Sequence, residues 1–257
     1  MRIVTLNTWK NEGDYARRLR LMGLGLAALG ADVVCLQECF AAEDADTAAE
    51  LARATRLAPH ARPARAKPRR HGGALVSSTS GLAMLTRRPG ADGVRTLAED
   101  PADGERIAQR LDLAGEAGPL RVLNLHLTHL RGPAAAALRG RQVAEALDWA
   151  RLNWTGAIVA VGDFNAPLEA EELAPALRLA ARPDRPEADY PRRSTLHGAS
   201  LGEARSGAPA IDHALLIDPS GAWRVRRRFL ALDRPDGEGW FPSDHAAVVV
   251  DLEPAYA

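Results

Sequence analysis

The sequence predicts an α/β fold with four layers, an α/β/β/α sandwich in which two mixed β-sheets pack face to face and helices cover the outside. Three observations predict it: a strand, helix and strand in the first 38 residues, short strands through residues 73–127, and a second helix and strand from residue 134. Hydrophobic residues make up 46% of the chain, which is typical of a protein with a substantial core. Because no linker or repeat divides the chain, we expect a single domain over residues 1–257.

The N-terminal elements form a βαβ pattern. Residues 2–6 (RIVTL) are apolar and β-branched, as in a buried strand. Apolar residues at helical spacing predict a helix over residues 15–29, and Gly30 is suited to end it. The run 32–37 (DVVCLQ) predicts a second buried strand, parallel to the first. The carboxyl ends of the two strands then meet at one sheet edge, where α/β proteins gather functional residues.

The middle of the chain alternates a helix, a proline-rich segment and short strands. A helix is predicted over residues 44–56, and the three prolines within residues 58–72 predict a loop or an irregular sheet edge there. The strands expected next, in antiparallel order, span residues 73–77, 81–86, a run near Val94, 106–113 and 120–127. Gly118 and Pro119 predict the turn before the last of these strands.

The last part of the chain repeats the opening pattern. A helix over residues 134–154 leads through Gly156 into a strand at 157–161. The remaining elements expected are a helix at 169–181, a loop rich in proline and arginine at 182–193, and strands at 211–217, 224–231 and 246–252.

The charge balance excludes a strongly basic or acidic protein. Lys and Arg together number 33, as do Asp and Glu, so no overall field draws the chain to nucleic acid or an anionic membrane. Two local basic runs, Arg62–Arg70 and Arg224–Arg228, could each contact phosphate through guanidinium groups. The alternative, a solvated loop or strand face, is the more common outcome for such runs.

Cysteine content and hydropathy favour a cytoplasmic protein. Cys35 and Cys39 lack the spacing of a redox or zinc motif, so we interpret them as small buried hydrophobic residues. The N-terminus is interpreted as a first strand and not as a signal peptide. No stretch approaches 18 uninterrupted apolar residues, so no integral membrane segment is expected. The pattern indicates no obligate protein partner.

Polar residues suited to chemistry recur where the predicted strands end. They are Asn7, Glu38, His126, Asp163, Asn165, Asp212, Asp244 and His245. Glu38 follows an apolar strand, and a buried carboxylate without a partner would cost several kcal/mol or more, so a metal ion is one expected partner. An N-cap or an exposed turn is the alternative for this glutamate.

The run Gly162–Asn165 (GDFN) projects an acid and an amide from one tight turn. Asp163 could orient or deprotonate water, and the Asn165 amide could donate to a phosphoryl oxygen. A simple Asx-turn is the alternative. Two further dipeptides, Asp212-His213 and Asp244-His245, each place an acid beside an imidazole, and a carboxylate on a histidine nitrogen would favour the protonated ring.

The motif set resembles the endonuclease/exonuclease/phosphatase superfamily, which includes deoxyribonuclease I-like nucleases, neutral sphingomyelinases and inositol polyphosphate 5-phosphatases. The resemblance covers most of the chain, in the superfamily's order. Its motifs are LNTW at Leu6–Trp9, LQE at Leu36–Glu38, SGLAMLTR at Ser80–Arg87, NLHL at Asn124–Leu127, GDFN at Gly162–Asn165, IDH at Ile211–His213 and SDH at Ser243–His245.

The resemblance implies a metal-dependent phosphoesterase and a role for each matched position. Glu38, with Asn7 and Asp244, would hold Mg²⁺ or Mn²⁺, because all-oxygen ligation suits these ions. Asp163 would align or activate the attacking water, and Asn165 would hold the scissile phosphate. No serine or cysteine lies in a nucleophile elbow, so direct attack by water is the simpler mechanism.

The resemblance assigns the remaining residues to the substrate and the acid-base network. His245 would polarise the phosphoryl oxygen or act as a base, with Asp212 orienting its ring, and His126 would contact phosphate or assist the leaving group. Arg141 lies in a stretch that follows this histidine in many bacterial members and is a predicted substrate-binding residue. Trp9 could line the pocket and stack on the substrate, or equally pack beneath the site.

Three functions stay open from the sequence. The first is a phosphodiesterase or phosphomonoesterase acting on a small or lipid-like phosphate ester. The second is a DNA or RNA nuclease of the same superfamily, which Trp9, His126 and His213 disfavour because repair-type nucleases carry other residues there. The third is a non-catalytic binding module, which the complete motif set disfavours.

Overall fold

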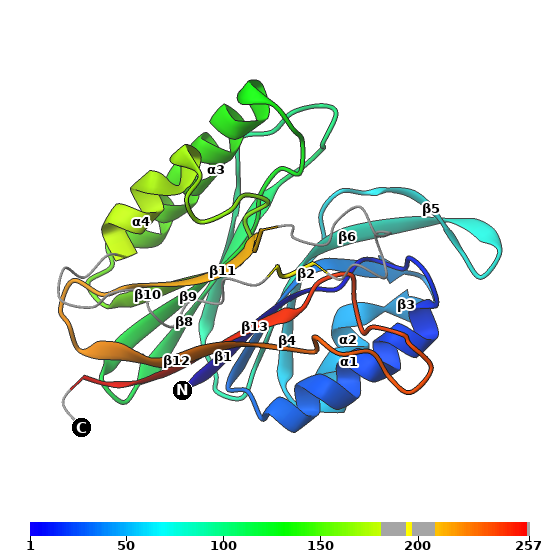
Figure 1. Ribbon diagram of the computed structural model, residues 1–257, viewed down its shortest axis with the longest axis horizontal. Coiled ribbons are helices and arrows are strands. Elements are labelled where there is room, and N and C mark those ends of the chain that lie inside the picture. Colours follow the sequence, from blue (N-terminus) through cyan, green and yellow to red (C-terminus); the bar gives the residue numbers. More distant parts are fainter. Residues whose placement is uncertain (181–193, 197–208, 256–257) are drawn as a thin grey trace.

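The computed structural model describes residues 1–180, 194–196 and 209–255, and its strands form two sheets that pack face to face (Figure 1). The strands of the first sheet are β1 (Arg2–Asn7), β2 (Val33–Ala42), β3 (Ala45–Asp46), β4 (Ala58–Arg62), β5 (Lys67–His71), β6 (Ala74–Thr86), β12 (Trp223–Ala231) and β13 (Ala247–Pro254). They lie in the order β12-β13-β1-β2-β6-β4, with β3 paired to β2 and β5 to β6.

The second sheet has the order β11-β10-β9-β8-β7. Its strands are β7 (Ala91–Thr96), β8 (Ile107–Gly115), β9 (Gly118–His126), β10 (Ala157–Asp163) and β11 (Asp212–Ile217). The pair β9 and β10 is parallel, and the other neighbours in this sheet are antiparallel. Both sheets are therefore mixed, as the sequence predicts.

Helices cover the outer face of each sheet (Figure 1). They are α1 (Tyr15–Leu29), α2 (Thr47–Thr55), α3 (Pro133–Arg151), a short 3₁₀ helix (Glu171–Leu173) and α4 (Ala174–Ala180). Apolar residues of α1 and α2 pack on the first sheet, and those of α3 and α4 pack on the second. A third apolar cluster joins the two sheets, so the predicted four-layer fold is confirmed. In the described residues, no helix combines the length and the apolar character that spanning a membrane requires.

The N-terminal βαβ unit forms as predicted. Strands β1 and β2 are parallel, with Ile3 opposite Val33. The Asp14 side chain accepts a hydrogen bond from the backbone of Arg17 at the start of α1, and Gly30 ends the helix with a φ of 59°. Because both strands run in the same direction, Asn7 and the Gln37-Glu38 pair arrive at the same edge of the sheet.

In the strand-rich region one alternative is confirmed and two predictions need correction. Residues 58–72, expected as a loop or an irregular sheet edge, contain β4 and β5, which both pair with the long strand β6, so the edge alternative is correct and Pro59 and Pro68 lie in these strands. The predicted strands 73–77 and 81–86 are parts of β6. The turn between β8 and β9 lies between Gly115 and Gly118, two residues before its predicted place. The predicted loop 182–193 lies outside the described residues.

The two cysteines are free and buried, as predicted. Cys35 belongs to the cluster between the sheets, and Cys39 packs in the layer under α1 and α2. Burial raises the pKa of both thiols well above the usual range, so they are protonated and unreactive at neutral pH.

Candidate active site

The candidate active site lies where strand ends of both sheets meet. On the second sheet, β9, β10 and β11 place His126, Asp163 and Asp212 side by side in register. On the first sheet, Asn7 ends β1, and its Nδ2 donates a 3.0 Å hydrogen bond to Oδ2 of Asp163. This bond links residues 156 positions apart in the chain and brings the two sheets' candidate residues together.

Gly162 permits the close approach of β10 to β9. Its φ is 137°, and a Cβ atom built there would lie 1.9 Å from the carbonyl oxygen of Leu125. Any larger residue would push the strands apart at this point. Glycine therefore allows the next residue, Asp163, to lie beside His126, with 3.6 Å between Oδ2 and Nε2.

Glu38 projects into the site from a bulge in β2. The pairing of β2 with β6 shifts between Leu36 and Cys39, and Glu38 has a φ of 56°, which is unfavourable for a residue with a side chain. Its Oε2 lies 3.0 Å from Nζ of Lys10, and its Oε1 lies 3.9 Å from Nε2 of His126. With 9% of its surface exposed, Glu38 is a buried acid of the site and not an exposed turn residue.

Asp163 and Asp244 are carboxyl groups that resist ionisation. Burial raises the pKa of Asp163 to about 7, and the neighbouring Asp212 carboxylate adds to the shift, although the His245 charge lowers it. Burial also raises the pKa of Asp244, and the Glu38 carboxylate adds to that shift. Both carboxyl groups therefore lose their protons less readily than an exposed aspartate does.

His245 and Asp212 form a buried ion pair. Nδ1 of His245 lies 2.8 Å from Oδ2 of Asp212, as the resemblance implied. Burial lowers the pKa of His245, but the Asp212 and Asp163 carboxylates outweigh it and hold this pKa well above its usual range. The ring is therefore protonated at neutral pH, and its Nε2 lies 4.0 Å from Oδ2 of Asp163.

The acid-imidazole contacts differ from those that the two dipeptides suggested. Asp212 pairs with His245, and its chain neighbour His213 places Nε2 2.8 Å from the carbonyl oxygen of Ala166. Successive side chains of β11 point to opposite faces of the sheet, so Asp212 and His213 face different surroundings. Burial lowers the pKa of His213, so the expectation of a protonated ring is wrong for this histidine.

His126 is held in the opposite state. Burial and the charges of Arg106, Arg65 and Lys10 lower its pKa well below the usual range. Arg106 is 2% exposed and donates to the His126 carbonyl oxygen at 3.4 Å and, through Nε, to Asp103 at 2.8 Å. His126 is therefore a neutral imidazole, able to accept or donate a hydrogen bond in the site.

Asn165 takes part in the Asx-turn that was one of the two alternatives for its motif. Its backbone N–H donates to Oδ1 of Asp163 at 2.8 Å, which is an Asx-turn, and its φ is 51°. Its side-chain Nδ2 donates to the carbonyl oxygen of Leu127 at 3.0 Å. The turn thus fixes the amide at the edge of the site beside Asp163.

Two groups of residues could hold a cation. Ligand atoms of Asp163, Asp212 and His245 all lie within 4.8 Å of one another. However, His245 is protonated and its Nδ1 bonds Asp212, and a charged imidazole cannot ligate a metal. Oxygen donors suit Mg²⁺ or Mn²⁺, and the predicted ligands Glu38, Asn7 and Asp244 all offer oxygen atoms. Burial raises the pKa of Asp244 and the Glu38 carboxylate adds to this shift, so these two acids interact. Cation binding by this set stays a prediction.

Two predicted substrate-binding residues differ in their distance from this cluster, since the Trp9 backbone N–H donates to Oδ1 of Asn7 at 3.0 Å. Arg141 is exposed on α3, and within the described residues it makes no hydrogen bond or ion pair with the other candidate residues. Its neighbour Gln142 is buried and accepts from the backbone of Thr128 at 2.9 Å, which supports the strand end that carries His126. Trp9 is partly exposed, and the Arg18 guanidinium lies 4.8 Å from its ring. Their substrate contacts stay predictions.

Sequence reasoning missed the residues that shape the site from behind. Arg18 is 1% exposed and donates to carbonyl oxygens of Thr8, Trp9, Lys10, Glu12 and Pro242. It thereby holds the loop that brings Lys10 to Glu38. The Gln37 amide donates to Asn124 Oδ1 at 2.7 Å and joins the sheets beneath the site. An arginine within an otherwise apolar helical stripe was the available signal for Arg18.

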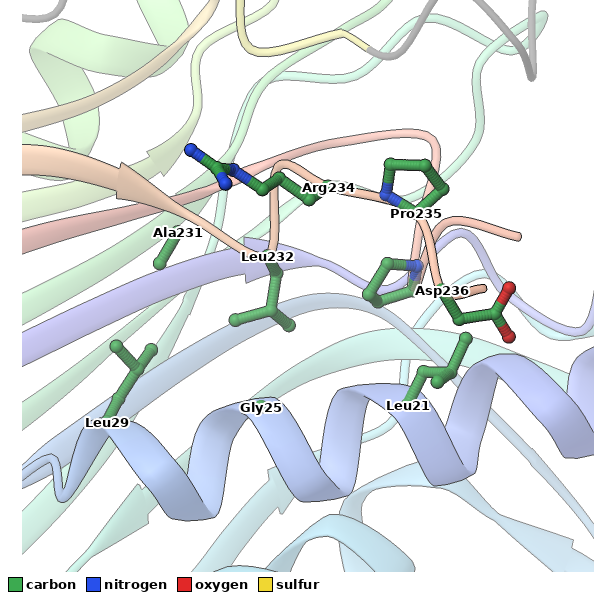
Figure 2. A pocket seen from close by; sticks show the side chains of 9 residues that line it. Leu21, Gly25, Leu29, Ala231, Leu232, Arg234, Pro235 and Asp236 are labelled. Carbon is green, nitrogen blue, oxygen red and sulfur yellow. The ribbon is translucent and has the colours of Figure 1, made fainter. Parts of the chain in front are cut away.

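A separate groove of ≈ 290 Å³ lies between α1 and the segment after β12 (Figure 2). Its lining is mostly apolar, and its one acid, Asp236, is paired with Arg17 at 2.6 Å. The lining residues are Leu21, Gly25, Leu29, Ala231, Leu232, Arg234, Pro235, Asp236 and Pro242. None of the candidate active-site residues lines this groove.

Comparison with known proteins gives the same family that the motifs suggested. The model of the Endonuclease/Exonuclease/phosphatase family matches residues 4–245. The fold is similar to an endonuclease/exonuclease/phosphatase from Beutenbergia cavernae DSM 12333, with 20% identity, a TM-score of 0.72, and coverage of 99% of this chain and 71% of that one. None of the curated protein sequences matches this chain.

Two further solved structures share the fold. The human nocturnin catalytic domain with bound sulfate anion is 18% identical, with a TM-score of 0.66, and the match covers 99% of this chain and 94% of that one. Sphingomyelinase C from Streptomyces griseocarneus is 19% identical, also with a TM-score of 0.66, and the match covers 97% of this chain and 98% of that one.

Proposed function

Because the chain belongs to the Endonuclease/Exonuclease/phosphatase family, we propose that it is a divalent-metal-dependent phosphoesterase that hydrolyses a phosphate ester by direct attack of water. One observation carries the proposal. Asp163 lies within 4.0 Å of both His126 and His245, and Glu38 lies 3.9 Å from His126, so a buried acid-base network faces one point. Buried ionisable groups that shift one another's pKa values are typical of catalytic sites and are not expected in a non-catalytic binding module.

The cation would be held by Glu38, with Asn7 and Asp244 as further oxygen ligands. When bound, it supplies positive charge that favours the ionised carboxyl groups and stabilises the charge of a pentavalent phosphoryl group. This would lower the pKa values of Asp163 and Asp244, which burial raises in the protein alone.

Asp163 is placed to accept the proton of the attacking water. Its Oδ1 and Oδ2 are fixed by the Asn165 backbone and the Asn7 amide, so the carboxylate does not need to reorganise during the reaction. A pKa of about 7 suits a general base at neutral pH. The Asn165 amide can donate to a phosphoryl oxygen if it exchanges its bond to Leu127.

The two histidines serve different steps. Protonated His245 donates from Nε2 to an equatorial phosphoryl oxygen, where negative charge increases in the transition state. Asp212 orients this ring through Nδ1 and stabilises its charge. Neutral His126 contacts the ester from the other side of Asp163 and assists the leaving oxygen.

The preferred substrate is a small or lipid-like phosphate ester. The formal net charge of zero provides no general attraction for a nucleic acid. Solved structures with this fold include a sphingomyelinase C, which is compatible with a lipid-like ester. The family also includes endonucleases and exonucleases by name, so a nuclease activity is the second candidate, and it predicts cleavage that weakens steeply as salt rises.

The test is hydrolysis of bis(p-nitrophenyl) phosphate and p-nitrophenyl phosphate with Mg²⁺ or Mn²⁺, beside single-stranded and duplex DNA. Glu38→Ala should lower metal-dependent turnover about 10²-fold or more and weaken Mn²⁺ binding in calorimetry. Glu43→Ala, which removes an exposed acid five residues away, is the control and should match the unaltered protein. Unchanged metal binding and hydrolysis in Glu38→Ala would refute the proposal.

A further inference from the structure

The two basic runs differ in their partners. In the run at residues 224–228, Arg224 pairs with Glu253 at 2.6 Å and Arg227 pairs with Asp251 at 2.6 Å. In the run at residues 62–70, only the first arginine has a close carboxylate of its own, since Arg62 pairs with Asp92. Carboxylates of the facing strand β13 thus balance the run at residues 224–228, whereas the run at residues 62–70 retains positive charge.

Arg69 is a buried cation that lacks a carboxylate partner in the described residues. It is 8% exposed, its Nη1 lies 2.9 Å from Oγ of Ser78, and its Nη2 lies 3.2 Å from the carbonyl oxygen of Arg65. Its Nε has no hydrogen-bond partner among the residues that the structure describes. A buried charge of this kind is costly unless another group balances it, so an anion is the missing partner.

A recess next to His126 is lined by one arginine of the run at residues 62–70, Arg65. Ser80, Glu105, Arg106 and His126 also line it. Ser80 is 3% exposed, and its Oγ has no hydrogen-bond partner within the described part of the chain. The recess has a volume of ≈ 10 Å³, which is room for about one oxygen atom. A larger group could therefore place one oxygen in the recess, and its other atoms would stay outside.

Gly81 makes this recess possible. A Cβ atom at Gly81 would lie 2.0 Å from the carbonyl oxygen of Arg62 and 2.8 Å from the backbone nitrogen of Ala64. The absence of a side chain therefore lets the segment that carries Arg65 cross close to β6. Arg65 itself has a φ of 52° and turns away from the strand direction at this crossing. The close approach at Gly81 and the positive φ of Arg65 thus together place Arg65 beside the site.

Two arginines, Arg65 and Arg106, and one acid, Glu105, line the recess. Asp103 lies 2.5 Å from Arg106, 2.8 Å from His129 and 3.5 Å from Arg65, so one carboxylate is shared. Glu105 also lines the recess and accepts from the Arg65 backbone at 3.3 Å. Burial lowers the pKa of Lys67, and the charges of Arg69 and Arg65 add to this shift, as expected for crowded cations.

We propose that Arg65, Lys67, Arg69 and Ser80 form a second anion subsite, which binds a second phosphate group of a small phosphate-ester substrate while the first is hydrolysed beside His126. The inference rests on the proposed function, because it defines the substrate of the same site. One oxygen of the second phosphate enters the recess and meets Ser80, and the guanidinium and ammonium groups surround the remaining oxygens.

Binding tests the subsite without any need for turnover. Calorimetry compares thymidine 3′,5′-bisphosphate with thymidine 5′-monophosphate at constant ionic strength. We expect the bisphosphate to bind about 10-fold more tightly, as one charge-assisted contact provides. Lys67→Gln, whose side chain is exposed, should lose most of this preference, and Arg69→Gln should lose it fully if it folds. Arg226→Gln removes the same charge from the other run and should retain the preference.

Hydrolysis then separates this inference from the proposed function. The substrates are the p-nitrophenyl ester of thymidine 5′-phosphate, with and without a 3′-phosphate, in the presence of Mn²⁺. A preference in binding without hydrolysis of either ester would support the subsite and contradict the phosphoesterase. Equal binding of the two nucleotides, or hydrolysis with no advantage from the 3′-phosphate, would overturn the subsite. Preferential cleavage of a single-stranded oligonucleotide over both esters would overturn the small-molecule assignment.

Discussion

His126 and His245 are buried to a similar degree on either side of Asp163, and yet one ring is neutral and the other is a cation. The Nε2 atoms of the two rings lie 3.6 Å and 4.0 Å from the same carboxylate oxygen. Burial alone would lower the pKa of both rings. The pKa of His126 falls well below its usual range, whereas the pKa of His245 rises well above it.

The difference comes from the partner behind each ring. His245 has Asp212 on its Nδ1, and this pairing brings a negative charge to 2.8 Å. Behind His126 lies Arg106, whose positive charge adds to the effect of burial. The two rings therefore act as a fixed cation and a neutral hydrogen-bonding group within one site. The identity of the residue alone does not determine which role a histidine has.

The largest expected effect compares removal of each ring. His245→Gln should lower kcat about 10³-fold, because a charged donor to the phosphoryl oxygen is lost. His126→Gln should lower kcat about 10-fold to 10²-fold, because glutamine can still form a neutral hydrogen bond. Steady-state kinetics on bis(p-nitrophenyl) phosphate measures both. Equal losses would contradict different roles for the two rings.

The next effect tests the source of the His245 charge. Asp212→Asn should lower kcat about 10²-fold and shift the alkaline limb of the pH profile to lower pH, because His245 loses the carboxylate that holds its proton. The profile of kcat/KM against pH gives the shift. Asp218→Asn, at the opposite end of β11, is a control away from the site. An unmoved alkaline limb in Asp212→Asn would show that another group holds this charge.

A third test concerns stability and the cation. Asp163 has a folded-state pKa of about 7, above its unfolded value, so without metal the folded protein loses stability as pH rises toward 7. His245 acts in the same direction at higher pH. The Tm between pH 5 and 8 should fall by about 5 °C, and Mg²⁺ should restore it. Asp251, whose pKa is lowered to about 2, acts only at lower pH.

Asp163→Asn removes this titration and should flatten the dependence of Tm on pH. Thermal unfolding followed by circular dichroism, with EDTA or with Mg²⁺, makes the comparison. A Tm that rises from pH 5 to 8 without metal would contradict the raised pKa of Asp163. A Tm that does not respond to Mg²⁺ would contradict cation binding at the site.

The smallest effect concerns the charges behind His126. Arg65→Gln removes one of the cations that lower the His126 pKa, so this pKa should rise while that of His245 stays unchanged. Arg65 is a better choice than Arg106, because removal of Arg106 would leave Asp103 buried without its main partner. NMR titration of the imidazole protons measures the change. A shift of both rings would show a general effect of charge.

The sequence predicted the candidate residues better than the contacts among them. Hydrophobic periodicity was sufficient for the βαβ unit and for the position of Asn7 and Glu38 at one sheet edge. It could not predict the β2 bulge that turns Glu38 toward the site, because a bulge depends on pairing with β6. The pairing of Asp212 with His245, and not with His213, likewise depends on how β11 meets the SDH motif in space.

The sequence also did not predict the buried polar side chains that support the site. Arg18 interrupts the apolar stripe of its helix, but only the folded loop supplies the carbonyl oxygens that it binds. Residues 58–72 contain prolines that normally interrupt strands, yet the long strand β6 offers an edge where they are tolerated. Both features depend on segments distant in the chain, which local patterns do not encode.

The most direct measurement is ¹⁵N NMR of the histidine rings in the metal-free protein at pH 7, with assignments from His126→Gln and His245→Gln. We expect a cationic ring at His245, with both nitrogens protonated, and a neutral ring at His126 in the same sample. Two rings that titrate together near pH 6.5, the usual histidine value, would contradict it.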